Sequence, residues 1–324
     1  MKALVIQEKQ EYPSLQDLPD LNEAPANEEI VDLKYSALNR RDYWITQGQY
    51  PGIKNGVIMG SDGMGMIKNR RVLINPGLDW GDNERVQSDA FNVLGLPRNG
   101  TFASQVVVPT ENIFNVPGHL TDAEAAALPL AGLTAYRVLF SRCSLQAGDK
   151  VLISGVGGGV AHIALLFAVA AGAQVTVTSS SKSKIEQAMD LGATHGFNYT
   201  NKDWAADCKN HVTKGFDVII DSAAGDNFSR FIYLSAPGGR IGIYGGTRGK
   251  IKSINPQILF WRQVSILGST MGSPSDFSQM LKFVSKHKIR PIIDKIYPLS
   301  KFQLAFQRMA VSNQYGKIVL DNEQ

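Results

Sequence analysis

The chain has 324 residues, 44 % of them hydrophobic, which exceeds what one hydrophobic core usually organises and predicts two domains. Its 33 basic and 29 acidic residues give a net charge of +4 with no basic run, so nucleic acid is not an expected partner. Two cysteines, no signal-like segment after Met1 and no run of 18 apolar residues argue against a disulfide framework and a membrane span, so we expect a soluble cytoplasmic protein.

The first part of the chain carries short β-type runs at residues 3–6, 29–35, 71–74 and 104–108. Proline, glycine and asparagine separate these runs, which predicts an irregular β domain. The pattern changes at Thr121-Asp122-Ala123-Glu124, where a helix N-cap with acids in the first turn precedes an alanine- and leucine-rich stretch. We therefore expect helices from about residue 121.

From residue 150 the chain alternates apolar strands with helices. The expected strands cover residues 150–154, 174–178, 195–198, 216–221 and 239–244, and the expected helices begin near 160, 183 and 227. Such alternation is typical of a parallel sheet covered on both faces, a doubly wound α/β fold. A strand at 264–270, helices at 275–287 and 305–309 and a strand at 317–320 follow, and the last strand could return to the first domain.

The strongest local motif joins a buried strand to an apolar helix through a glycine cluster, Gly155-Val156-Gly157-Gly158-Gly159-Val160-Ala161. Glycine permits the tight turn and lets the backbone approach a pyrophosphate, while the helix N-terminus supplies amide donors and positive potential. A glycine-rich turn without a ligand is the alternative, but the flanking strands favour a dinucleotide site. The residues assigned to cofactor binding are Gly155, Gly157, Gly158, Gly159 and Val160.

The residues after the second strand bear on which nicotinamide dinucleotide binds. An acidic residue there would bind the ribose 2′-hydroxyl and mark NAD, but the sequence reads Thr178-Ser179-Ser180-Ser181-Lys182. Hydroxyls and an ammonium suit a 2′-phosphate, so we favour NADP(H) over NAD(H) and assign Ser179, Ser180 and Lys182 to its adenosine end. The alternative is a serine N-cap followed by a solvated lysine.

These features, with further motifs, resemble the medium-chain dehydrogenase/reductase superfamily and within it the zinc-independent quinone oxidoreductase-like branch. The motifs span nearly the whole chain: Ala37-Leu38-Asn39-Arg40-Arg41-Asp42, Gly60-Ser61-Asp62-Gly63, Gly100-Thr101-Phe102-Ala103, Ala126-Ala127-Leu128-Pro129, Leu191-Gly192-Ala193 and Gly238-Gly239-Arg240. The resemblance implies a GroES-like β-rich catalytic domain at 1–118 and 262–324, with a doubly wound Rossmann NADP-binding domain at 119–261. The segment between Gly65 and Arg71 is shorter than is usual in the family, which implies a shortened β connection.

Zinc-dependent relatives carry a catalytic cysteine near the position of Arg40 and a histidine at that of Ser61. Residues 1–118 contain neither cysteine nor histidine, and carboxylates alone make a poor zinc site, so we expect no metal. Without a Lewis acid, alcohol oxidation is disfavoured. The expected reaction is therefore hydride transfer to a quinone or to an activated C=C or carbonyl compound.

The resemblance also implies roles for single residues. Asn39 would lie near the nicotinamide ribose and Thr134 near the carboxamide, although a turn-forming asparagine and a helical threonine are the alternatives. Tyr199 would neighbour the 2′-phosphate. The strand ends are expected to line the cofactor with Tyr244, Gly245 and Ser269.

Tyr50, in Gly48-Gln49-Tyr50-Pro51, falls where related enoyl reductases place a tyrosine that gives a proton or a hydrogen bond to the substrate. A phenol suits this role because it is a neutral donor near pH 7, and an aromatic lid residue is the alternative. Tyr43 is expected with it in the substrate cleft. Asp42 is expected to hold the loop, because a carboxylate beside the hydride acceptor would oppose negative charge. The candidate catalytic residues are thus Tyr50 and Asn39.

Three functions remain open from the sequence. The first is an NADPH-dependent reductase of quinones or enones, and the second is an enoyl-thioester reductase, for which Arg40, Arg41, Arg70 and Arg71 are either phosphate-binding groups or ordinary surface charges. The third is a non-catalytic NADPH-binding structural or sensor protein. In the family the strand at 264–267 pairs with its copy in a second subunit, so we expect a homodimer through this edge of the Rossmann domain.

Overall fold

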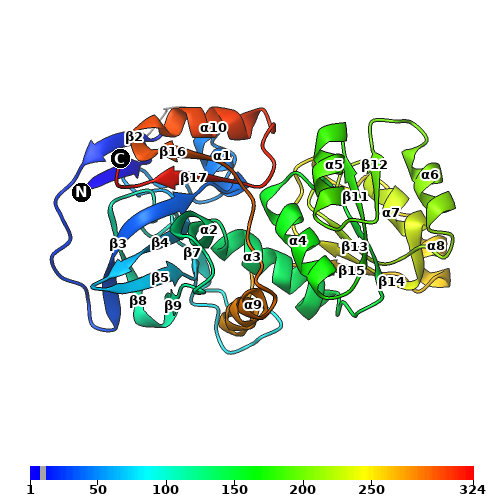
Figure 1. The fold of residues 1–324 in the computed structure, drawn as a ribbon, viewed down its shortest axis with the longest axis horizontal. Helices are drawn as coiled ribbons and strands as arrows, with labels where there is room; N and C mark the ends of the chain where they lie inside the picture. The colour runs from blue at the N-terminus through cyan, green and yellow to red at the C-terminus, as the bar shows by residue number, and fades with distance from the viewer. Residues whose placement is uncertain (8–11) are drawn as a thin grey trace. The chain divides into compact units, whose positions relative to one another are not determined.

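The computed structural model describes residues 1–7 and 12–324, and these residues divide into two compact units. Unit 1 combines Met1–Leu133 with Gly272–Gln324, so both chain ends lie in it, and unit 2 is the segment Thr134–Met271 (Figure 1). The sequence places the changes of domain at 118/119 and 261/262 instead. Unit 2 extends to Met271 rather than to residue 261 because β15 (Ser265–Gly268) is hydrogen-bonded to β14 (Ser235–Ile243) and so belongs to the same sheet.

Unit 1 is built on a mainly antiparallel sheet. Its described strands run in the order β16-β17-β3-β4-β5-β9, with β8 also on β3. Their bounds are β3 Glu28–Ala37, β4 Asp62–Ile67, β5 Arg70–Ile74, β8 Gln105–Pro109, β9 Ile113–Asn115, β16 Ile293–Pro298 and β17 Lys317–Asp321. Strand β17 pairs antiparallel with β3, Val319 opposite Ala37, so the end of the chain completes a sheet begun near its start. Smaller sheets pair β1 (Lys2–Val5) with β2 (Ser14–Asp17) and β6 (Gly77–Leu78) with β7 (Asn92–Val93).

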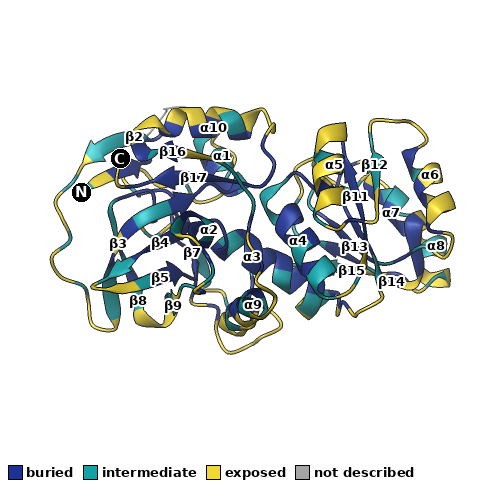
Figure 2. Ribbon diagram, in the orientation of Figure 1, coloured by how far each residue is buried: buried dark blue, intermediate teal, exposed yellow. Residues whose placement is uncertain are grey.

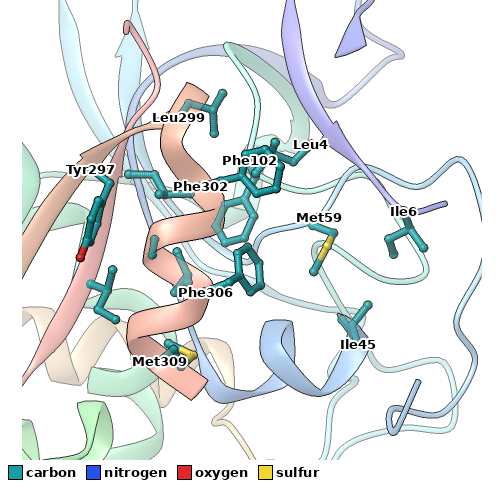
Figure 3. Close-up of a cluster of buried hydrophobic side chains, with 14 of the residues drawn as sticks. Leu4, Ile6, Ile45, Met59, Phe102, Tyr297, Leu299, Phe302, Phe306 and Met309 are labelled. Carbon is teal, nitrogen blue, oxygen red and sulfur yellow. The ribbon is translucent and has the colours of Figure 1, made fainter. Parts of the chain in front are cut away.

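Helix α10 (Phe302–Ala310) covers the core of unit 1 because its apolar residues recur on one face. Phe302, Phe306 and Met309 belong to a buried cluster that also contains Phe102 and Met59 (Figure 3). The opposite face of α10 is largely exposed (Figure 2). The other helices that begin in unit 1 are α1 (Arg40–Thr46), α2 (Asp122–Ala126), α3 (Pro129–Tyr136) and α9 (Pro274–His287).

Unit 2 is a parallel sheet whose described strands run in the order β12-β11-β10-β13-β14-β15. The bounds not yet given are β10 Lys150–Ile153, β11 Gln174–Ser179, β12 His195–Asn198 and β13 Phe216–Asp221. Its helices are α4 (Gly159–Ala170), α5 (Lys182–Asp190), α6 (Trp204–His211), α7 (Phe228–Leu234) and α8 (Pro256–Trp261), with a π-helical segment η2 (Arg137–Arg142) before β10. The strand order runs outward on both sides from β10, as in a doubly wound dinucleotide-binding domain, so the predicted fold class is confirmed.

Some elements differ from those that the sequence predicts. Helices α1, α6 and α8 were not predicted, and each has eight residues or fewer, too short for a clear helical period. Strand β14 begins at residue 235 rather than 239 because its pairing with β13 shifts register, Phe216 facing Ser235 and Val218 facing Arg240. The short β connection is confirmed, since only residues 68 and 69 separate β4 from β5.

Three backbone segments of unit 1 approach one another closely at glycines. A Cβ on Gly100 would lie 1.9 Å from the carbonyl oxygen of Gly60, and a Cβ on Gly95 would lie 2.5 Å from the same atom. Gly60 and Gly95 also have positive φ angles, +97° and +87°. Steric exclusion of any side chain therefore explains the glycines that open two of the sequence motifs.

Replacing Gly100 with alanine should lower the free energy of unfolding by about 1–3 kcal/mol, because the new methyl group meets backbone that cannot rotate away. Gly118→Ala is the control, since a Cβ there meets no heavy atom within 4 Å, and its effect should stay within about 0.5 kcal/mol. Urea-induced unfolding followed by circular dichroism measures both variants. Equal stabilities would contradict the packing argument.

Candidate active site

The glycine loop leads from β10 to the start of α4, where the strand order of unit 2 reverses. Gly155 has a φ of +63°, a conformation that side chains other than glycine rarely adopt. Gly158 is the N-cap of α4. Because glycine has no side chain, the amides of Gly159 and Val160 receive no hydrogen bond from a capping side chain. The loop therefore has the conformation and the amide donors that a pyrophosphate requires.

Lys184 lies beside this loop. A Cβ built on Gly157 would lie 2.6 Å from Lys184 Cδ and 3.2 Å from its Nζ. Lys182, which the sequence assigned to the cofactor, is instead exposed and lies 3.6 Å from Glu186 of the same helix. The available signal for Lys184 was Ser181, which caps α5 by accepting the Lys184 amide N–H and so places this residue in the first turn.

The other residues assigned to the adenosine end lie where β11 and β12 end. Ser179 is buried, and its Oγ accepts a hydrogen bond from the Ser181 N–H at 3.2 Å. Ser180 is exposed. The N–H of Tyr199 donates to the carbonyl of Ser179 at 3.1 Å. Ser179, Ser180 and Tyr199 are thus gathered at one edge of the sheet.

Two buried hydroxyls follow the neighbouring strands β14 and β15. Neither Tyr244 Oη nor Ser269 Oγ has a hydrogen-bond partner among the described residues. Burial raises the pKa of Tyr244, which keeps the phenol neutral, and the nearby Ser222 side chain opposes this shift without meeting hydrogen-bond geometry. A Cβ on Gly245 would lie 2.9 Å from the Ser222 carbonyl oxygen. Because buried polar atoms without partners are costly, these hydroxyls fit a site that a polar ligand completes.

Asn39, the N-cap of α1, is held by a buried network in unit 1. Its Oδ1 accepts from Lys317 Nζ at 2.6 Å, and its Nδ2 donates to Asp62 Oδ2 at 2.9 Å. Lys317 Nζ also lies 2.8 Å from Asp62 Oδ2 and 2.9 Å from the Leu38 carbonyl oxygen, while Asp62 Oδ1 accepts from the Leu130 N–H at 2.7 Å. The carboxamide of Asn39 therefore has a fixed orientation.

Sequence reasoning missed Lys317 and Asp62, although both carried a signal. Lys317 opens an apolar strand, and Asp62 lies between Ser61 and Gly63 in a stretch that is buried throughout. A charged residue in such a stretch needs a buried partner of opposite sign. What the sequence does not give is which acid meets which lysine.

Asp42 is fully buried and accepts the Asn39 N–H at 2.7 Å through Oδ2. Its Oδ1 has no partner among the described residues. Burial raises the pKa of Asp42 to about 6, while the charge of Arg41 and the Asn39 hydrogen bond oppose the shift. Asp42 thus fastens the start of α1, as the sequence predicts for a loop-holding residue.

A second cluster surrounds Arg41 on α1. Its Nη1 donates to Ser61 Oγ at 2.5 Å and to the Leu94 carbonyl oxygen at 2.8 Å, and its Nη2 donates to the Leu96 carbonyl oxygen at 3.3 Å. Its Nε donates to Tyr50 Oη at 3.3 Å, and the guanidinium carbon lies 5.0 Å from the centroid of that ring. The predicted catalytic tyrosine is therefore held by an arginine that the sequence left as either a phosphate ligand or an ordinary surface charge.

The remaining predicted residues are Tyr43 and Thr134. Tyr43, on α1, packs partly buried against the core of unit 1, 5.8 Å from the Arg40 guanidinium carbon. Thr134 is a buried residue of α3. Within residues 1–7 and 12–324, no three His, Cys, Asp or Glu residues are grouped as metal ligands. Over the same residues, no helix is both long and apolar enough for a membrane crossing.

Two family patterns match the chain. The alcohol dehydrogenase GroES-like domain matches residues 25–118, within unit 1, and the family described as zinc-binding dehydrogenase matches residues 159–286, mostly in unit 2. A zinc-type alcohol dehydrogenase-like protein of Schizosaccharomyces pombe is 35 % identical over 314 residues, covering 90 % of each chain. The matches thus reach both units.

Solved structures agree with this assignment. The crystal structure of an NAD-dependent alcohol dehydrogenase is similar to this chain, with 33 % sequence identity and a TM-score of 0.93 over 99 % of each chain. The quinone oxidoreductase of Thermus thermophilus, also solved with NADPH, is 25 % identical, with a TM-score of 0.83 over 99 % of this chain and 100 % of that one. The predicted GroES-like and Rossmann folds are therefore confirmed.

Replacing Asp42 with asparagine should change how stability depends on pH. Because the folded-state pKa lies above the ordinary value of 3.8, the folded protein binds the Asp42 proton more tightly, and this stabilisation is lost as the pH rises from about 4 to 6. Asp42→Asn keeps an acceptor for the Asn39 N–H, so relative to wild type it should gain about 2 kcal/mol between pH 4 and pH 7. Urea unfolding at both pH values measures the gain, and a gain no larger than that of exposed Asp17→Asn would contradict the assignment.

Proposed function

The chain belongs to the medium-chain dehydrogenase/reductase superfamily, whose members include oxidoreductases, and on that premise we propose that it is a metal-independent reductase of quinones or enones that uses NADPH. The observation that carries the proposal is the Arg41, Ser61 and Tyr50 cluster, in which the phenol proposed as the proton donor contacts a buried cation. Residues 1–118 offer no cysteine or histidine to a metal.

The residues of unit 2 fit a phosphorylated dinucleotide. The amides of Gly159 and Val160 would bind the pyrophosphate, and Tyr244 Oη and Ser269 Oγ would donate to or accept from its nicotinamide end. Lys184 lies in the first turn of α5, directly after the serines that end β11, where a 2′-phosphate would bind and no acid is present, which supports NADP(H) over NAD(H). A bound reduced nicotinamide supplies a hydride to the substrate carbon.

The residues of unit 1 supply positioning and a proton. Lys317 and Asp62 fix the Asn39 carboxamide, so the second lone pair of its Oδ1 can accept from a ribose hydroxyl in a constant direction. Tyr50 would give its proton to the substrate oxygen or α-carbon as the hydride arrives, and would regain it from water. The product then carries one hydride and one proton more than the substrate.

The enoyl-thioester alternative gains no support from its four candidate arginines. Arg70 lies 3.8 Å from Glu29, and Arg71 lies 2.5 Å from Asp122. Arg40 donates to the Met309 carbonyl oxygen and to Ser312 Oγ, and Arg41 is buried. Separate neighbours hold each arginine, which disfavours a shared phosphate-binding patch.

A second copy of the chain is the proposed partner. Strand β15 ends the described parallel sheet and leaves one edge unpaired. Helix α8 precedes it and exposes two large apolar side chains, Phe260 at 64 % and Trp261 at 83 %. A twofold pairing of β15 with its copy would extend the sheet and supply a neighbouring apolar surface.

Oxidation of NADPH by a panel of quinones, enones and enoyl-CoAs tests the activity, followed by the absorbance of the reduced nicotinamide. We expect turnover with quinones or enones and faster turnover with NADPH than with NADH. Turnover with enoyl-CoAs alone would favour the thioester reductase. No oxidation by any acceptor would leave the non-catalytic NADPH-binding protein.

Lys184→Ala should weaken NADPH binding by about 10- to 100-fold, because it removes a charge-assisted hydrogen bond to the 2′-phosphate. NADH binding should change little. Lys182→Ala is the matched control on the same helix and should affect neither coenzyme. Fluorescence titration measures the four affinities, and equal losses for NADPH and NADH in Lys184→Ala would contradict a role at the 2′-phosphate.

Tyr50→Phe should lower kcat by about 10²-fold, because the ring is kept but the transferable proton is lost. Affinity for NADPH should stay unchanged. Tyr35→Phe, in the sheet of unit 1, is the control for loss of a phenol. Steady-state kinetics with an active acceptor gives both values, and an undiminished kcat would return Tyr50 to the lid alternative.

Trp261→Glu should weaken self-association by more than about 10-fold, since buried tryptophans dominate interface energies. The control is Val311→Glu on unit 1, where the side chain is 63 % exposed. Sedimentation equilibrium measures the dimer dissociation constant. A monomeric wild type, or equal effects of the two substitutions, would refute the β15 interface.

A further inference from the structure

Arg41 is a buried cation whose guanidinium is in direct contact with no described carboxylate. Its residue is 8 % exposed, and no carboxylate of residues 1–7 and 12–324 lies within 4.0 Å of its nitrogens. Its acceptors are two hydroxyls and two backbone carbonyls. The adjacent Asp42 carboxylate is directed at the Asn39 N–H instead. The charge of Arg41 still acts on the neighbouring Asp42 carboxyl, but no acid is in contact with the guanidinium.

Three other arginines of unit 1 each form an ion pair with a carboxylate, unlike Arg41. Arg71 meets Asp122, Arg98 meets Glu28 and Arg308 meets Asp294, each with a carboxylate oxygen in hydrogen-bond contact. Removing a guanidinium from water without a counter-charge costs free energy, which hydroxyls and carbonyls offset only in part. A buried guanidinium that contacts only hydroxyls and carbonyls therefore favours a ligand that is negatively charged or becomes so during the reaction.

The direction of the Arg41–Tyr50 hydrogen bond follows from chemistry. A guanidinium has donors only, so Nε–H donates and the phenolic oxygen accepts. Tyr50 makes no other hydrogen bond to a described residue. Its own hydrogen is thus left for a ligand. The guanidinium against the ring face also restrains the ring.

We propose that Arg41 is the positioning residue of this site, which orients the Tyr50 hydroxyl toward the substrate and supplies the fixed positive charge that stabilises the oxyanion formed as hydride arrives. The inference rests on the proposed reductase function and deepens it. Arg41 transfers no proton, so the hydride, the Tyr50 proton and the water that restores it balance as before. The preferred substrate class is a neutral carbonyl-conjugated compound or quinone whose oxygen becomes negative during reduction.

The first test compares Arg41→Met with Arg41→Lys and with Arg71→Met, which removes an arginine that has its own acid. Arg41→Met should lose about 10²-fold in kcat while keeping NADPH affinity, and Arg41→Lys, which keeps a cation, should recover part of the loss. In a Tyr50→Phe background Arg41→Met should cost less than in wild type, because the orienting role is already lost with the phenol while the charge on the oxyanion remains. A further variant, Arg41→Ala, removes the guanidinium and leaves space for a free one. Added methylguanidinium should therefore raise its turnover. Additive losses, or a kcat for Arg41→Met equal to that of Arg71→Met, would overturn the proposal.

The second test needs no turnover. The oxyanion probe is 4-nitrophenolate, used at a pH above the pKa of 4-nitrophenol. Wild type and Arg41→Lys should bind it with a shift of its absorbance spectrum, and Arg41→Met should bind it at least about 10-fold more weakly. Neutral 4-nitroanisole should bind all three alike. Charge-selective binding in a protein that reduces none of the panel would refute the reductase but not the oxyanion site. Reduction of quinones with no loss of phenolate binding in Arg41→Met would refute the role of Arg41 alone.

Discussion

The buried contact between Lys317 and Asp62 is the constraint on which unit 1 depends. The ammonium has three hydrogens and finds three acceptors, Asp62 Oδ2, Asn39 Oδ1 and the Leu38 carbonyl oxygen. Because an ion pair in low dielectric is stable only when every remaining donor and acceptor is also satisfied, β17, β4 and the start of α1 must meet in one arrangement. Breaking such a pair costs about 3–5 kcal/mol, so the last strand of the chain is essential to the domain that its first strands begin.

The two buried cations of unit 1 differ in how their charge is balanced. Lys317 is neutralised by Asp62 and holds the structure together, whereas Arg41 donates only to uncharged acceptors and acts on the Asp42 carboxyl without direct contact. The Asn39 carboxamide is oriented by the first and the Tyr50 hydroxyl by the second. A cation paired with an acid thus fixes the positions of its neighbours, whereas a cation whose direct contacts are uncharged can stabilise negative charge that forms on a reacting group.

Sequence patterns predicted most of unit 2 but only part of the site. Strand β10, the glycine loop and α4 were predictable because their signals are local: an apolar run, glycines at the turn and an apolar helix. Tyr50 and Asn39 came from motif resemblance. Lys184 was not assigned, and Arg41 was considered only as a phosphate ligand or a surface charge, because a lysine two positions from another lysine and an arginine beside another arginine look alike until the fold buries one more deeply than the other.

The sequence by itself determined the class of the chain: a dinucleotide loop followed by alternating strands and helices, and a first segment, residues 1–118, without thiols or imidazoles for a metal. These are properties of composition and of neighbours within a few residues. Tertiary structure alone decided which charges pair. Lys317 meets an acid 255 positions earlier, and the Arg41 guanidinium reaches Ser61 and Tyr50 from another segment. Such contacts depend on how distant segments pack in three dimensions, and no local period or spacing encodes them.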